Sequence, residues 1–201
     1  MLLFKSINIT GKCTAKMKYF LSIVSVYRNS LLLLIVTSPL TDRGFISLTQ
    51  IPQATNNIYE QQYQMGLFLK QYYIGESVAV NDIGAVSFIG DVKTLDLIGL
   101  GNIEVAKLRM KNLYDTKKIQ DLATENDVKI AIIYDHWFTG GMPSDWIKVG
   151  QWTIPNNVIC GGDTVSFYAT NPEEEKKLEE NLKMFSSNLP MDIKQTGNYS
   201  L

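Results

Sequence analysis

Three side chains at or next to the ends of predicted strands are candidates for ligand binding or catalysis. Asp82 closes the run "SVAVND" (77–82), Asp135 closes "VKIAIIYD" (128–135), and His136 follows directly. The carboxyl ends of parallel strands meet at one edge of an open α/β sheet, where such folds bind ligands. A carboxylate pair at that edge could hold a divalent cation or accept hydrogen bonds from sugar hydroxyls. For Asp82, however, the favoured interpretation is that it caps the helix that follows.

Hydrolytic chemistry is a weaker hypothesis for the same three residues. His136 is the only histidine, which excludes a metal site built from several histidines, and we expect neither a metal nor a cofactor. An Asp-His-Ser arrangement could form in space and make the chain an independent hydrolase. No serine stands in a GxSxG elbow, however, so we assign no catalytic residue.

Two tryptophans flank the glycine-rich loop "TGGMPSD". Trp137 and Trp146 could stack on a glycan ring, and tryptophans that anchor the loop to the core would explain the pattern equally well. The candidate ligand-binding residues are therefore Asp82, Asp135, His136, Trp137 and Trp146.

Nucleotide binding is disfavoured although "GLGNIE" (99–104) follows a predicted strand. The third small residue of the GxGxxG fingerprint is replaced by Glu104, and no GxxxxGK[ST] motif is present. Asp96, between two leucines of that strand, is expected to order structure. Cys13 and Cys160 lie far apart, so no disulfide framework or CxxC site is indicated.

The pattern of apolar runs predicts the fold that must position these residues. Strands over 77–82, 93–100 and 128–135 alternate with helical segments, which is the order of a parallel α/β sheet. The segments "WIKVGQWTI" and "DTVSFYATN" read as an antiparallel pair. We therefore expect an α/β fold: a mixed sheet of about three parallel strands plus an antiparallel pair, with helices on both faces and one preceding N-terminal transmembrane helix.

Several helix boundaries can be predicted from local signals. A helix after Asn56 or Asn57, as N-cap, carries a stripe with Tyr59 and Tyr63 that is typical of core rather than of a sugar-stacking face. A short helix should begin near Ile83, and a later one has Thr116 as a plausible N-cap. The last should begin at Pro172, where acidic residues 173–175 suit the N-terminal dipole.

The segment "YFLSIVSVYRNSLLLLIVTSPL" (19–40) is long enough to cross a bilayer, since about 20 helical residues span its hydrocarbon core. Arg28 costs about 2.5–3.5 kcal/mol near the centre of a span, which about a dozen large apolar residues can offset. Four lysines precede the segment, so the positive-inside rule places the N-terminus in the cytoplasm and the rest of the chain outside. A signal peptide and a buried soluble helix are the alternatives, because Arg28 divides the apolar run.

The predicted organisation follows from this span. Residues 1–18 form a basic cytoplasmic leader, 19–40 the transmembrane helix, 41–55 a linker, 56–190 an extracytoplasmic α/β domain and 191–201 a flexible tail. Six basic residues and one acidic residue fall in 1–43, so the rest of the chain is acidic overall and no nucleic-acid partner is expected.

A family resemblance is carried by motifs in a fixed order. Arg43, "IPQA" (51–54), "NDIGA" (81–85) and "LDLIGL" (95–100) resemble the C-terminal extracytoplasmic region of bacterial GT-C type, mannosyltransferase-like polytopic membrane glycosyltransferases. The resemblance covers about residues 31–190. It implies a last transmembrane helix followed by an extracytoplasmic α/β domain that shapes the acceptor side of the enzyme.

What the resemblance implies for function is limited by the spans that this sequence contains. Enzymes of the family carry many membrane helices and an acidic catalytic residue in their first extracytoplasmic loop, whereas here we predict one span. The resemblance thus implies a fragment without catalysis of its own, which works in cell-envelope glycan or glycolipid assembly. Its implied partners are a membrane glycosyltransferase subunit or a polyprenyl-linked glycan. A glycan-binding or assembly module outside the membrane is the alternative.

Overall fold

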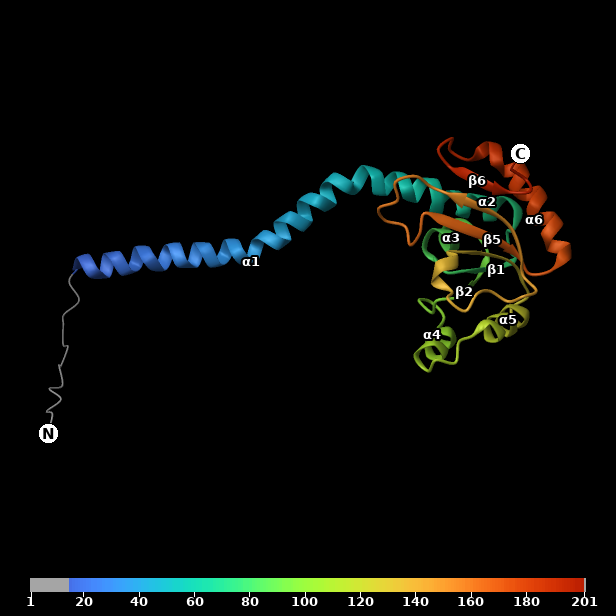
Figure 1. The fold of residues 1–201 in the computed structure, drawn as a ribbon, viewed down its shortest axis with the longest axis horizontal. Helices are drawn as coiled ribbons and strands as arrows, with labels where there is room; N and C mark the ends of the chain where they lie inside the picture. The colour runs from blue at the N-terminus through green and yellow to red at the C-terminus, as the bar shows by residue number, and fades with distance from the viewer. Residues whose placement is uncertain (1–14, 201) are drawn as a thin grey trace. The chain divides into compact units, whose positions relative to one another are not determined.

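The computed structural model describes residues 15–200, with side chains from residue 18 onward. The predicted basic leader, 1–18, therefore lies almost entirely outside the described residues. The chain divides into two compact units, Met1–Thr49 and Gln50–Leu201. Each unit is described by itself (Figure 1).

The described part of the first unit, residues 15–49, is the N-terminal part of one long helix. Helix α1 (Ala15–Ile58) continues through a π-helical turn, η1 (Tyr59–Tyr63), into α2 (Gln64–Tyr72). Among the described residues, the continuous helix Lys18–Tyr72 is the one that is long and apolar enough to cross a membrane, and its most apolar window has no buried residue. A helix that is apolar all round is stable inside a protein core or a bilayer, and this one is not in a core. This part of the helix therefore has the length and composition of a candidate membrane span.

The expected linker over 41–55 is wrong, because α1 is helical throughout that range. The serine and threonine content that suggested a loop is accommodated by the helix itself. Thr41 Oγ1 donates to the Ser38 carbonyl at 2.9 Å, and Thr49 Oγ1 donates to the Ile46 carbonyl at 2.8 Å. Because these hydroxyls donate to carbonyls of the preceding turn, they are satisfied within the helix and do not require a loop.

The second unit is built on a six-stranded mixed sheet with strand order β2-β1-β3-β5-β4-β6. Strands β1, β2 and β3 are parallel, and β3, β5, β4 and β6 pair antiparallel. This confirms the predicted α/β fold and adds β6 to it. The bounds are β1 Ser77–Val80, β2 Lys93–Asp96, β3 Val128–Ile133, β4 Ile147–Thr153, β5 Thr164–Ala169 and β6 Lys194–Gly197.

The expected flexible tail over 191–201 is also wrong, since this segment holds β6 and two buried side chains, Ile193 and Tyr199. Trp152 Nε1 donates to the Tyr199 hydroxyl at 3.1 Å. Gly150 makes this docking possible, because a Cβ at that position would collide with the Tyr199 ring. The tail is therefore tied to the sheet by contacts with β4.

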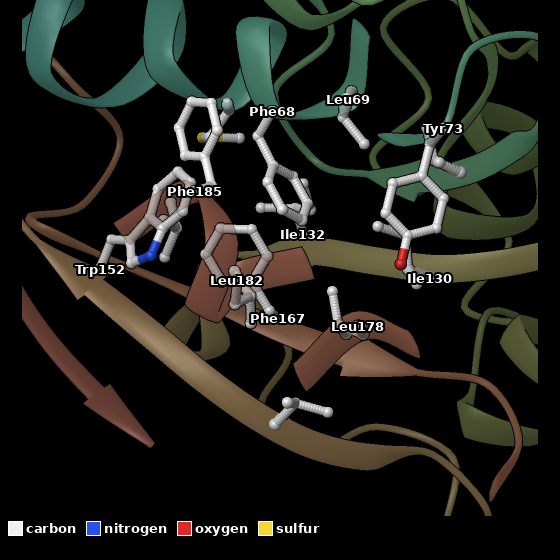
Figure 2. Packing of buried hydrophobic residues seen from close by; sticks show 14 of the residues in the cluster. Phe68, Leu69, Tyr73, Ile130, Ile132, Trp152, Phe167, Leu178, Leu182 and Phe185 are labelled. Carbon is white, nitrogen blue, oxygen red and sulfur yellow. The ribbon is translucent and has the colours of Figure 1, made fainter. Parts of the chain in front are cut away.

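One face of the sheet carries the larger core. Helices α2 and α6 (Pro172–Phe185) pack on it, with the short α3 (Gly84–Ile89) beside them. Phe68 of α2 stands at the centre, with its ring centroid 5.6–5.7 Å from those of Trp152, Phe167 and Phe185 (Figure 2). Edge-to-face contacts of this kind add to the stabilisation from area burial.

The opposite face is covered over only half of its width. Helices α4 (Ile103–Met110) and α5 (Thr116–Glu125) pack on the parallel strands, on the side of the sheet away from α2 and α6 (Figure 1). These helices and strands enclose a second, smaller core. Over β5 and β4, residues of the loop after β3, such as Phe138 and Trp146, complete this second core. The rest of this face, on β4, β5 and β6, presents polar side chains.

The aromatic stripe expected in the helix after residue 56 is wrong for its two tyrosines. Tyr59 and Tyr63 are exposed and stack on each other, with ring centroids 5.7 Å apart. The buried positions in the same turn are polar: Glu60, Gln61 and Gln62. The π-helical turn shifts the helix phase, as single π-turns do, often at functional sites.

The predicted start of one helix is confirmed, and the predicted N-caps of two others are corrected. Asn171 caps α6, which begins at Pro172 with acidic residues in its first turn, as expected. The N-cap of α5 is Asp115, whose carboxylate accepts the Lys118 amide at 2.8 Å, rather than Thr116. Asn57 is no N-cap, because it lies inside the continuous helix. Its side chain instead donates to the Pro155 carbonyl at 3.1 Å.

Candidate functional site

A buried polar network joins the π-helical turn η1 to the carboxyl ends of β1 and β3. Gln62 Nε2 donates to the Asp82 carboxylate at 3.0 Å and to the Tyr134 hydroxyl at 2.7 Å, and that hydroxyl donates to Gln61 Oε1 at 2.7 Å. Burial raises the pKa of Asp82, with a backbone hydrogen bond from Gly84 acting in the opposite direction. Asp82 is not the N-cap of α3, as the sequence had suggested, because Ile83 holds that position. Asp82 thus has a structural partner, Gln62, that the sequence did not reveal.

Cys160 lies near this network in the turn between β4 and β5. Burial, and then the negative charges of Asp82 and Glu60, raise the pKa of its thiol to about 11. A thiol with such a pKa stays protonated at neutral pH and is a poor nucleophile. The structural interpretation of Cys160 is supported, while Cys13 lies outside the described residues.

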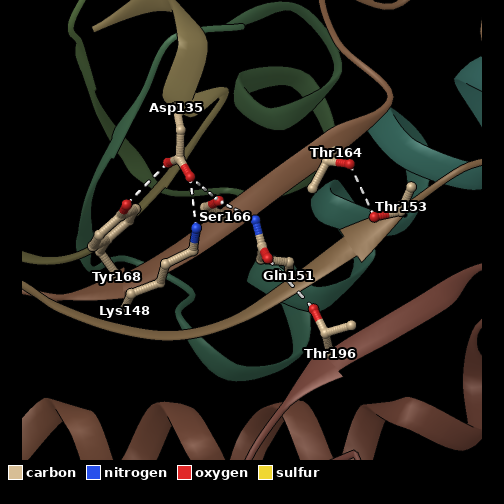
Figure 3. A network of polar contacts seen from close by, with 8 residues as sticks. All are labelled: Asp135, Lys148, Gln151, Thr153, Thr164, Ser166, Tyr168 and Thr196. Carbon is tan, nitrogen blue, oxygen red and sulfur yellow. Dashed lines mark hydrogen bonds and ion pairs between the residues drawn. The ribbon is translucent and has the colours of Figure 1, made fainter. Parts of the chain in front are cut away.

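Asp135 anchors a second polar network, on the open half of the sheet (Figure 3). Lys148 Nζ lies 2.6 Å and Ser166 Oγ 2.8 Å from its Oδ2, and the Tyr168 hydroxyl donates to its Oδ1 at 3.0 Å. Gln151 Nε2 donates to Ser166 Oγ at 3.0 Å. The network therefore runs from the end of β3 across β5 to β4.

A β-bulge places both Lys148 and Gln151 on this face. The register of β4 against β5 shifts between Lys148 and Gly150, so that one extra residue is inserted. Side chains of a regular strand alternate between faces, so residues three apart would point to opposite sides. The bulge restores the same side for both, and bulges are common beside functional sites.

The hydrogen bonds keep Asp135 ionised. Burial alone would raise the pKa of this carboxyl, but the bonds from Lys148, Ser166 and Tyr168 outweigh it and lower that pKa below its ordinary value of 3.8. The Asp135 carboxylate is thus a fixed negative charge with both oxygens engaged. It lacks the raised pKa that a general acid needs at neutral pH.

A pocket of about 430 Å³ lies on the polar half-face, next to this network. Every residue that lines it is polar: Asp135, His136, Gln151, Thr153, Asp163, Thr164, Ser166, Lys194 and Thr196. Thr153 and Thr164 share a hydrogen bond of 2.9 Å across the paired strands. We call these nine residues the polar pocket.

Three ionisable groups of the polar pocket are free to meet a ligand. Within residues 15–200, His136, Asp163 and Lys194 have no side-chain hydrogen bond or ion pair, in contrast to Asp135. These side chains offer hydrogen-bond donors and an acceptor to the polar pocket, and each threonine hydroxyl can both donate and accept. Such a mixture fits a ligand with many hydroxyl groups.

The geometry disfavours a serine nucleophile in the polar pocket. In a Ser-His-Asp triad the serine hydroxyl donates to the histidine. Here the Ser166 hydroxyl donates to Asp135 instead, at 2.8 Å. Among the described residues, no group of three or more His, Cys, Asp or Glu side chains is placed to hold a metal ion.

The two candidate tryptophans differ in their surroundings. Trp146 is only 6% exposed and belongs to the second core, so it has no free face for a sugar ring. Trp137 is 36% exposed, and its ring packs 5.4 Å from that of Tyr134. It lines a separate pocket of about 310 Å³ together with Arg109 and the glycine-rich loop.

Asp96 explains why the "GLG" motif is no nucleotide site. Its carboxylate accepts the backbone amides of Ile98, Gly99, Gly101 and Asn102, at 2.6–3.3 Å. Clustered backbone amides are the groups with which a glycine-rich turn binds phosphate. Here the protein's own carboxylate takes these donors, so Asp96 orders the loop as the sequence indicated.

The structure thus brings two of the five candidate residues, Asp135 and His136, into one pocket. Asp82, Trp137 and Trp146 line other parts of the unit. Sequence reasoning missed Ser166 and Tyr168, although the alternation in "DTVSFYATN" places both on one face with Thr164. It also missed Lys148, Gln151 and Lys194, because their positions depend on the bulge and on β6.

Fold and site define a class: an α/β domain with a half-open polar sheet face, preceded by one long apolar helix that is a candidate membrane span. Residues 56–168 match the family described as "Domain of unknown function (DUF8728)", and the chain belongs to this family. The matched region includes the π-helical turn, the end of β3 and all of β5 but its last residue, and stops before α6 and β6. Searches of curated proteins and of solved structures found no match.

Proposed function

We propose that the chain is the membrane-anchored, extracytoplasmic domain of a GT-C type glycosyltransferase system, and that it binds a glycan without transferring sugar itself. The assignment to cell-envelope glycan or glycolipid assembly rests on the ordered motifs from Arg43 to "LDLIGL". The orientation rests on the lysines that precede the apolar segment.

The observation that carries glycan binding is the composition of the polar pocket. All of its lining residues are polar, and it opens on a sheet face with no helix above it among the described residues. Pockets for apolar ligands are lined mainly by hydrophobic and aromatic side chains. A sugar, whose hydroxyls donate and accept, is the ligand class that matches Asp163, Lys194 and the threonine hydroxyls.

The absence of catalysis is supported by the state of the potentially reactive side chains, which are held by hydrogen bonds or protonated. Both oxygens of Asp135 are held by neighbours, the Ser166 hydroxyl is directed at Asp135, and the Cys160 thiol is protonated at neutral pH. The remaining candidate, His136, has no carboxylate partner among the described residues to orient it. A histidine without an orienting group is a weak general base.

The test is a binding and transfer assay on the full chain in lipid nanodiscs. Soluble oligosaccharides and polyprenyl-phosphate-linked sugars are titrated while tryptophan fluorescence is recorded, and the same samples are assayed for sugar transfer. We expect saturable binding of at least one glycan and no transfer. Sugar transfer by this chain alone would contradict the non-catalytic assignment.

A histidine variant tests the hydrolase alternative in the same preparation. If His136→Ala binds the glycan more weakly and no hydrolysis is seen with either protein, the binding proposal is supported. Hydrolysis by the wild-type chain that disappears in His136→Ala would favour the hydrolase instead.

A further inference from the structure

Helix α4 is apolar on two opposite faces. Val105 on one face is fully buried against the second core, as expected for a helix that covers a sheet. Ile103 and Met110, seven residues apart, share the other face and are 70% and 85% exposed. Leu100 and Leu113, just outside the helix, are 72% and 60% exposed. A second partner for this face is therefore missing within the described chain.

The charges on this face are positive. Lys107 lies between Ile103 and Met110 on the same side of the helix, and Lys111 follows Met110. Both lysines are exposed and form no ion pair within residues 15–200. The nearby acidic side chain, Glu104, is paired with Lys118 at 3.6 Å. We call the four apolar residues and two lysines the α4 surface: Leu100, Ile103, Lys107, Met110, Lys111 and Leu113.

The α4 surface begins at the carboxyl edge of the parallel strands of the second unit. The loop that leads into α4 follows the carboxyl end of β2 and packs on Ile83, since a Cβ on Gly101 would lie 3.1 Å from Ile83 Cδ1. Asp82, next in sequence, accepts a hydrogen bond from Gln62, in the first turns after α1. Within the second unit, η1 and the start of α4 therefore lie at the same edge of the sheet.

We propose that the α4 surface docks on an anionic lipid bilayer. Exposed apolar residues with flanking lysines are the composition of helices that lie in the membrane interface. Ile103, Met110 and the two leucines would sit at the boundary of headgroups and acyl chains, and Lys107 and Lys111 would meet lipid phosphates. The proposal requires that the helix anchors the chain, and it is independent of glycan binding in the polar pocket.

Nitroxide accessibility tests this docking in the full chain. Cys13 and Cys160 are replaced by alanine, Met110→Cys is spin-labelled, and the protein is reconstituted in nanodiscs of phosphatidylcholine alone or mixed equally with phosphatidylglycerol. Met184→Cys, at an exposed methionine of α6, is the matched control. With phosphatidylglycerol we expect the label at 110 to become accessible to oxygen and shielded from an aqueous nickel chelate, while the label at 184 stays accessible to nickel.

Charge removal supplies the second measurement. Lys107→Gln and Lys111→Gln should each reduce the ratio of docked to free domain about fivefold. Lys176→Gln with Lys183→Gln on α6 should leave this ratio unchanged. A label at 110 that remains as accessible to nickel as the label at 184 overturns the proposal. A label shielded from both reagents in either lipid also overturns it, because that result indicates a protein partner or a second copy.

Discussion

Asp96 and Asp135 are chemically the same group at the carboxyl ends of two parallel strands, but their surroundings differ. Asp96 is 3% exposed and is held by four backbone amides of the loop that follows it. The Asp135 side chain is 41% exposed and is held by side chains of β4 and β5. One carboxylate folds its own loop, and the other connects strands beside a pocket.

The difference shows which carboxylates at a sheet edge are available for function. Backbone donors are fixed by the path of the chain, so Asp96 can only serve the conformation of 97–102. Gly99 has φ +90° there, and a Cβ on it would lie 2.6 Å from the Ala106 amide nitrogen. Side-chain donors can be rearranged or replaced, so the region around Asp135 can be adapted to a ligand without loss of the fold.

The largest expected effect is on stability at Asp96. Asp96→Ala leaves four part-buried backbone amides without their acceptor, and we expect it to lower the free energy of unfolding by about 3–5 kcal/mol. All three tryptophans belong to the second unit, so tryptophan fluorescence during urea denaturation of the full chain in detergent reports this unit alone. A loss under about 1 kcal/mol would contradict the structural role of Asp96.

A smaller effect is expected at Asp135, because its ion pair with Lys148 is part-exposed. Asp135→Asn should cost about 1 kcal/mol or less at neutral pH. The folded-state pKa lies below the ordinary 3.8, so the carboxylate's contribution is present above pH 3.8 and is lost as pH falls through the lower value. The difference between wild type and Asp135→Asn should therefore shrink in acid. A difference that is constant with pH would show that Asp135 has no preferred charge state in the fold.

The smallest effect on stability is expected at Asp82, and its pH dependence should be opposite to that of Asp135. Burial raises the pKa of this carboxyl above 3.8, so the folded state binds its proton more tightly than the unfolded state. The associated stability is present below pH 3.8 and is lost as pH rises through the folded-state value. Relative to wild type, Asp82→Asn should gain stability as pH rises from acid to neutral. Parallel urea denaturations across this range measure it, and a change in the other direction would contradict the burial argument.

How far the sequence predicted the structure depends on whether the signal was local. Three parallel strands, an antiparallel pair and the start of α6 at Pro172 were predicted. The apolar runs and helix-start residues that determine these elements lie within the same short segments of sequence. Strand β6, "KQTG", has no apolar residue and forms by pairing with β4, so no local pattern revealed it. The helix over 41–55 was missed because hydroxyl contacts such as that of Thr49 compensate for a loop-like composition.

The candidate site was predicted only in part for the same reason. Asp135 and His136 could be found because they follow a buried strand. Lys148 reaches the site through a bulge, and Gln62 is buried through a π-helical turn, and neither irregularity has a signature in the residue types. Tyr59 and Tyr63 were placed in the core because the expected phase was that of a regular helix.

The most direct test of the central claim is whether glycan binding depends on the free groups of the polar pocket. Isothermal titration of the full chain in nanodiscs compares wild type with Asp163→Ala and Lys194→Ala, which remove the free carboxylate and ammonium. Asp121→Ala and Lys117→Ala, exposed on α5, are the matched controls. We expect each pocket variant to weaken binding about tenfold, the cost of about one hydrogen bond to a charged group, and the controls to bind as wild type does. Binding that is unchanged in both pocket variants would contradict the assignment of this pocket as the glycan site.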